Sequence, residues 1–203
     1  MIGSYSNVDG LFIGNALGDD GLAAVNIAWP IVAFITSVGA GLGIGGSIAV
    51  NGTRGKGDTE VAERKKLTAL LLLFAAGILT TALCSALYIP VLKFLGATGE
   101  VFRYAENYSL VISLGAAFQV VGIGLIMLLR GEGKTVSALI YSAVGLIAHV
   151  VFDALTVKKF GLYGVSGACV AAQAIVAALS LVTFLKKDKS RETADTIKTL
   201  SET

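Results

Sequence analysis

Three ionisable side chains lie in stretches of the sequence that are otherwise apolar: Asp9, His149 and Asp153. His149 and Asp153 are four residues apart, so on a helix they lie on one face and can contact each other. A carboxylate at the middle of a bilayer costs about 2.5–3.5 kcal/mol on insertion scales, and such acids mostly mark an ion or substrate path. The pattern therefore favours a site that binds a proton or another cation.

The two acids have the chemistry that cation coupling needs, because neighbouring buried carboxyl groups titrate as one coupled unit. His149 is the only histidine, and it could share a proton with them or ligate a cation through one ring nitrogen. Structural explanations stay open. Asp153 could be a carboxylate near a helix end, followed by Lys158 and Lys159, and His149 could be a neutral ring bonded to a backbone carbonyl.

Four further polar residues lie in or beside apolar stretches. Tyr5 lies one helical turn before Asp9 and could hydrogen-bond a protonated carboxyl group. Asn26, Gln119 and Gln173 are candidates to line a substrate cavity. They could equally make interhelical hydrogen bonds, which are common in membranes and contribute only about 0.6 kcal/mol on average.

The composition indicates that these residues are positioned by membrane helices. The chain has 203 residues, 55% hydrophobic and 15% charged, with a mean hydropathy of +0.78. Soluble domains carry roughly 45–50% apolar and about 25% charged residues. The sequence shows no nucleophile and base pair, phosphate-binding loop or metal cluster, and no nucleic-acid partner is expected. The net charge of +2 says little about partners. We therefore expect a membrane protein that is not an enzyme and has no cofactor.

Five apolar segments are long enough to cross a bilayer, which takes about 20 residues each. They are 22–50, 67–92, 108–129, 136–157 and 165–185. Residues 1–17 reach only about 26 Å as a helix, too short for a hydrocarbon core of about 30 Å, and are interpreted as part of a first helix. We predict an all-α, polytopic bundle of about six transmembrane helices over residues 1–185. Residues 186–203 form a polar tail or linker.

The basic residues predict how this bundle is oriented. Of the 16 Lys and Arg residues, four fall on one side of the predicted spans: Lys93, Arg103, Lys158 and Lys159. The other twelve fall on the opposite side, in the loops after the second and fourth helices and in the tail. Because cytoplasmic loops carry the excess of Lys and Arg, both termini are predicted to lie in the cytoplasm. We expect a multi-pass protein of the plasma membrane.

At this point several segments carry a family resemblance. The chain resembles the amino-terminal half of the multidrug and toxic compound extrusion (MATE) transporters. The matching segments are 8–14 with 17–18, 22–28 with Pro30, 41–47, 55–58 with Ala62, 129–134 and 161–168. Their order and spacing hold over nearly the whole chain apart from the tail.

The resemblance implies a carrier of two six-helix lobes that exports amphipathic organic cations in exchange for Na⁺ or H⁺. The conserved acid of the family's first helix falls on Asp9, its nearby tyrosine on Tyr5, and the acid of its fifth helix on Asp153. In many members an asparagine and a threonine complete the cation site. Here these positions are His149 and Ala172, which favours proton coupling over Na⁺ at the two acids.

The family has about twelve helices, so the resemblance also implies that a second lobe or second chain is required. Two copies in the same orientation could form a two-lobed cavity. The alternative is a truncated, non-transporting fragment, or a partner subunit of a full-length carrier. A lipid-linked sugar flippase of similar architecture is less favoured, because nothing in the sequence selects a sugar.

Overall fold

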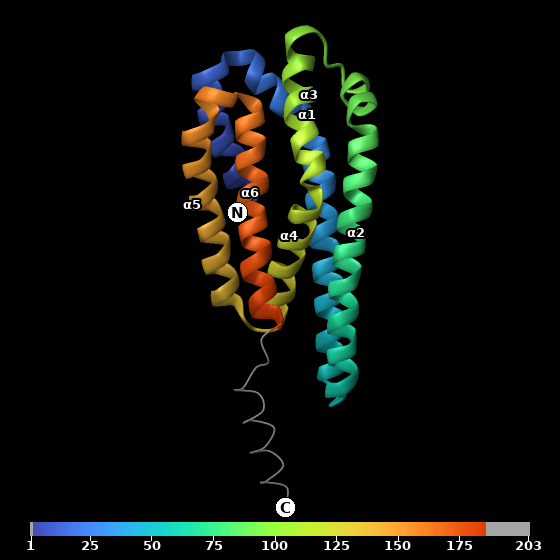
Figure 1. Ribbon diagram of the computed structural model, residues 1–203. Coiled ribbons are helices and arrows are strands. Elements are labelled where there is room, and N and C mark those ends of the chain that lie inside the picture. The colour runs from blue at the N-terminus through green and yellow to red at the C-terminus, as the bar shows by residue number, and fades with distance from the viewer. Residues whose placement is uncertain (1, 186–203) are drawn as a thin grey trace, which may run out of the picture.

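The computed structural model describes the backbone of residues 2–185 and side chains from Asp9 onward. Every secondary-structure element in this part of the chain is a helix (Figure 1). The helices are α1 (Ile2–Arg54), α2 (Thr59–Phe94), α3 (Gly99–Leu114), α4 (Ala116–Gly131), α5 (Thr135–Phe160) and α6 (Leu162–Leu185). The all-α prediction is confirmed. The predicted tail, 186–203, and the side chain of Tyr5 lie outside the described residues.

α1 contains two predicted segments, 1–17 and 22–50, joined at a sharp break. Gly18 adopts φ 67° and ψ −157° inside this helix, a conformation that a residue with a Cβ rarely adopts. In Figure 1 the chain starts at mid-height of the bundle, rises to one end, turns, and then descends along its full length. The break therefore returns the first segment of α1 into the bundle.

The predicted span 108–129 is a pair of helices rather than one. α3 and α4 meet at Gly115 with a bend of 58°. A Cβ on Gly115 would collide with Val170 of α6. The glycine thus allows α6 to pack closely at the bend, a contact that hydropathy alone does not reveal.

The lengths and apolar character of the helices confirm a polytopic bundle. α1 from Asp9, α2, α5 and α6 are each long and apolar enough to cross a membrane, and the bent α3–α4 pair counts as a fifth candidate span. About six spans were expected. Two of the expected segments, on either side of the kink at Gly18, lie within α1 and are counted there as one candidate span.

The contact between α1 and α4 depends on two glycines one turn apart. A Cβ on Gly39 would lie 2.7 Å from the carbonyl oxygen of Val120, and a Cβ on Gly43 would lie 2.5 Å from that of Gly124. Helices in lipid pack closely where small residues let their backbones approach. The glycine-rich stretch of α1 is thus a helix-packing surface.

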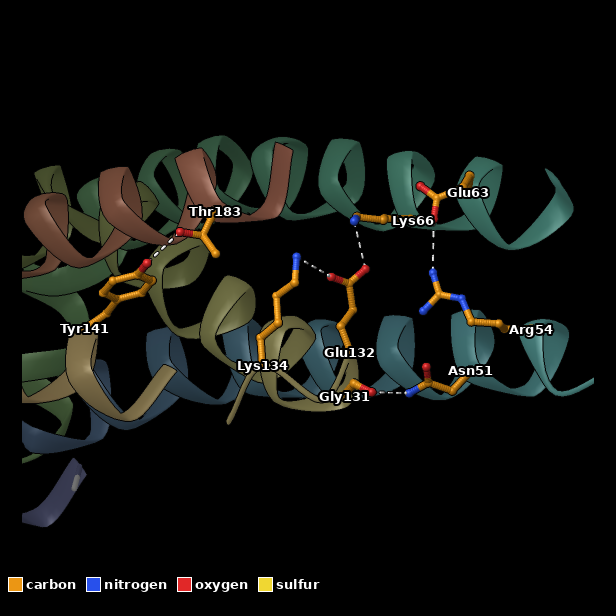
Figure 2. Close-up of polar contacts among 9 residues, drawn as sticks. All are labelled: Asn51, Arg54, Glu63, Lys66, Gly131, Glu132, Lys134, Tyr141 and Thr183. Atoms are coloured by element: carbon orange, nitrogen blue, oxygen red, sulfur yellow. Dashed lines mark hydrogen bonds and ion pairs between the residues drawn. The ribbon is translucent and has the colours of Figure 1, made fainter. Parts of the chain in front are cut away.

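A polar cluster ties several helices together at the end of the bundle where α4 ends and α5 begins (Figure 2). The buried Glu132 carboxylate lies 2.8 Å from Nζ of Lys66 in α2 and 3.9 Å from Nζ of Lys134. The Lys66 ammonium also lies 4.4 Å from the ring centre of Phe184 in α6. Nearby, Nδ2 of Asn51 in α1 donates a 2.8 Å hydrogen bond to the Gly131 carbonyl.

We predict that Gly43→Ala destabilises the chain by about 1–3 kcal/mol, the usual cost of overpacking, since its methyl group would meet the α4 backbone. Gly45→Ala is the matched control, because nothing lies within 4 Å of that position. Thermal unfolding of both variants in detergent, followed by circular dichroism, measures the difference. Equal melting temperatures would contradict this packing role.

We also predict that Lys66→Ala destabilises the chain by about 3 kcal/mol, because it removes a partner from a buried carboxylate. Arg64→Ala breaks the Arg64–Glu60 pair, whose side chains are 78% and 80% exposed. It should change stability by less than about 1 kcal/mol. Thermal unfolding of the two variants under the same conditions measures both losses of stability. A loss for Lys66→Ala as small as that for Arg64→Ala would refute the stabilising role of the cluster.

Candidate cation site and adjoining cavity

The structure brings Asp9, His149 and Asp153 together inside the bundle. Nε2 of His149 lies 3.2 Å from Oδ1 of Asp9 and 3.4 Å from Oδ2 of Asp153. Asp9 comes from the first segment of α1, which the Gly18 break turns inward, and the other two come from successive turns of α5. The side chains are 5%, 0% and 0% exposed, in the order named. The predicted contact between His149 and Asp153 is therefore present, and Asp9 joins it.

The charge of the two acids is not balanced by lysine or arginine. Across residues 9–185, no ion pair joins Asp9 or Asp153 to such a side chain. Lys158 and Lys159, which follow Asp153 in the sequence, are exposed. The site therefore needs positive charge from a proton, a protonated imidazole or a bound cation.

Three potential ligand atoms converge here. Asp9, His149 and Asp153 each offer one nitrogen or oxygen, and these atoms lie within 4.8 Å of one another. When both acids are ionised, no donor in the described part of the chain hydrogen-bonds to either oxygen of Asp153. The arrangement can thus accept a proton or hold a cation.

A cavity of about 670 Å³ adjoins the site, and Asp9 lies in its wall. Gln119 of α4 and Gln173 of α6 also line it, as the sequence analysis predicted. Asn26 is exposed on α1 and is not among the lining residues. Much of the remaining wall is apolar: Trp29, Val32, Ile123, Ile126, Met127 and Val176.

The cavity wall also contains residues that were not among the predicted candidates, and Tyr108 and Arg130 are two of them. Tyr108 is buried in α3 and lies in the wall with Asp9. Its position at the start of an expected span gave no reason to assign it a role. Arg130, in the last turn of α4, also lines the cavity. From the sequence, Arg130 stands out only as one of the basic residues that predict the orientation of the bundle.

Ala172 lies fully buried in α6. Its methyl group offers no ligand for a cation. The described donor set therefore consists of one imidazole and two carboxylates.

Comparisons with known proteins agree with this architecture. The MatE family model matches residues 1–155. The probable multidrug resistance protein YoeA of Bacillus subtilis is 26% identical over 183 residues, covering 87% of this chain and 39% of that protein. The FAD transporter of Shewanella oneidensis is 28% identical over 191 residues, and the match covers 92% of this chain and 42% of that protein.

A solved structure of an inward-facing multidrug resistance MATE family transporter of the MOP superfamily superposes with a TM-score of 0.85 at 28% identity. The match covers 91% of this chain and 43% of that one. The chain thus spans about two fifths of the length of the relatives it matches. With a family match over most of its length and the same helical lobe, the chain is a multi-pass membrane protein that belongs to the MatE family, as its sequence segments predicted.

Proposed function

We propose that this chain forms a cation-coupled lobe of an efflux transporter. Asp9 and Asp153 would bind the coupling cation, and the adjoining cavity would hold an amphipathic organic substrate. The observation that carries the proposal is the buried contact of Asp9, His149 and Asp153 at the wall of a cavity, within a chain of the MatE family. The relatives are named as transporters or multidrug proteins, which supports transport rather than catalysis.

Asp9 provides the physical link between cation and substrate, because it belongs to the buried cluster and also lines the cavity. While ionised, it can act as counter-ion for a cationic substrate. When a proton or metal cation neutralises the cluster, that attraction is lost and the substrate binds less tightly. Such differential binding is what shifts a carrier between two states in alternating access.

The donor set favours H⁺ over Na⁺ as the coupling ion. Hard cations prefer oxygen ligands, whereas this cluster contains the nitrogen of His149 and receives no oxygen from the side chain of Ala172. An imidazole beside two carboxylates can take up and release a proton. Na⁺ at Asp9 and Asp153 is the alternative.

The cavity supports an amphipathic substrate, since apolar and aromatic walls surround a few polar groups. An organic cation would pair with Asp9. Arg130 at the same cavity favours a second candidate, an organic anion such as the FAD named for the Shewanella relative. Efflux assays with both classes distinguish them.

A second lobe or second chain would complete the transport path, because the relatives are more than twice as long as the segment they share with this chain. Trp29, a cavity residue, is 53% exposed and could lie against it. In this proposal the protein lies in the plasma membrane with both termini in the cytoplasm. The other candidate is a non-transporting partner of a full-length carrier.

We predict that proteoliposomes containing this chain release a fluorescent organic cation under a pH gradient, and that Asp153→Asn abolishes the release. Asp19→Asn is the matched control, since this acid is exposed on α1 outside the site. Efflux that survives Asp153→Asn would refute the coupling role. Absence of efflux from the unaltered chain would show that copies of this chain do not transport by themselves and that a second lobe or a full-length partner is required.

We further predict that His149→Asn lowers proton-driven efflux and raises the share driven by a Na⁺ gradient, because the asparagine amide replaces the ring nitrogen with an oxygen ligand. Initial rates measured in opposing H⁺ and Na⁺ gradients give this ratio. An unchanged ratio would show that His149 does not determine ion preference.

A further inference from the structure

We infer that Asp9, His149 and Asp153 form a binding site for a divalent transition-metal ion, with Zn²⁺ as the best-matched probe. The inference goes beyond the proposed function, because it requires neither transport nor a second lobe. It concerns the same carboxylates, so a bound metal would compete with the coupling cation.

The spacing of the ligand atoms fits a tetrahedral ion. Zn²⁺ binds imidazole nitrogen at about 2.0–2.1 Å and carboxylate oxygen at about 2.0–2.2 Å, so two ligand atoms of a tetrahedral site lie about 3.3–3.5 Å apart. Nε2 of His149 is 3.2 Å from an oxygen of Asp9 and 3.4 Å from an oxygen of Asp153. Both separations approximate edges of such a tetrahedron, so small side-chain adjustments would suffice to hold an ion.

The charge and chemistry of the ligands also favour a divalent transition metal. Two ionised carboxylates neutralise a 2+ ion, whereas a single monovalent ion leaves one uncompensated negative charge in a buried site. Imidazole nitrogen together with carboxylate oxygen suits Zn²⁺ and its neighbours, while oxygen-only sets suit Na⁺, Mg²⁺ and Ca²⁺. His149 therefore shifts the preference of this site toward transition metals.

A second observation points to a ligand between the acids. Asp153 is 0% exposed, and when both acids are ionised neither of its oxygens accepts a hydrogen bond in the described part of the chain. Burial of such acceptors without partners is unfavourable. A cation held by Asp153 and Asp9 would satisfy these oxygens and remove the repulsion between the two carboxylates.

The cavity supplies the route to the site. Asp9 lines the volume of about 670 Å³, so an ion that enters the cavity reaches the first carboxylate directly. Three protein ligands leave one tetrahedral position for water or another small ligand, the arrangement of open rather than closed zinc sites.

The test is metal binding to the purified full chain in detergent. Isothermal titration with Zn²⁺ should give one site per chain, and Co²⁺ in its place should give the visible absorption of a four-coordinate ion. A large excess of Na⁺ should not displace either metal. His149→Asn and Asp153→Asn should each weaken binding by more than about 100-fold, since loss of a second-shell partner alone costs 10–100-fold.

Two controls separate this site from other metal-binding groups. Asp19→Asn removes an exposed acid, and Cys84→Ser with Cys169→Ser removes both thiols. Both should retain the affinity of the unaltered chain. Circular dichroism and gel filtration verify that each variant is folded. If a ligand variant fails to fold, the absorption spectrum of Co²⁺ bound to the unaltered chain identifies the ligands. Co²⁺ bound by histidine and carboxylate absorbs differently from Co²⁺ bound by thiolate.

Absence of Zn²⁺ binding, six-coordinate Co²⁺ only, or binding that persists in His149→Asn would overturn the inference. These outcomes are independent of transport. If the chain binds Zn²⁺ but its proton-driven efflux survives Asp153→Asn, the proposed coupling role is refuted and the metal site stands. Conversely, if the unaltered chain shows proton-driven efflux but does not bind Zn²⁺, only the inference is refuted.

Discussion

The rest of this structure depends on how two carboxylates are held out of water inside a helix bundle. Lipid offers no hydrogen bonds, so an acid in a membrane helix must meet protein partners or an internal cavity. Asp9 achieves both because the backbone breaks at Gly18 and the first segment of α1 turns inward to α5. Without that turn, His149 would contact only the acid four residues away on its own helix.

Close packing elsewhere keeps this arrangement in place. α1 and α4 touch backbone to backbone through Gly39 and Gly43, while the cluster around Glu132 joins the ends of several helices. These contacts surround the cavity with helices in fixed positions.

The helical bundle could be predicted well from the sequence, because long apolar segments are what crossing a bilayer requires. The pairing of His149 with Asp153 also followed from their spacing on one helix. The two acids were expected to interact, but the convergence of Asp9 with His149 and Asp153 could not be derived from spacing, since it needs the positive φ of Gly18. The bend at Gly115 and the exposed position of Asn26 were likewise missed, because hydropathy reports burial in lipid but not which neighbour a helix face meets.

The position of Asp9 implies a specific form of coupling. A carboxylate buried away from the cavity could bind a cation but could not contact the substrate. A carboxylate fully exposed in the cavity wall could contact the substrate but would not belong to the buried cation site. Asp9 is 5% exposed, contacts His149, and still forms part of the cavity wall. In the proposed function, a cation at the cluster and a cationic substrate would share one carboxylate, so each would lower the affinity for the other by the same factor. Under that proposal, exchange of one for the other would follow from a single side chain, with no coupling pathway through distant residues.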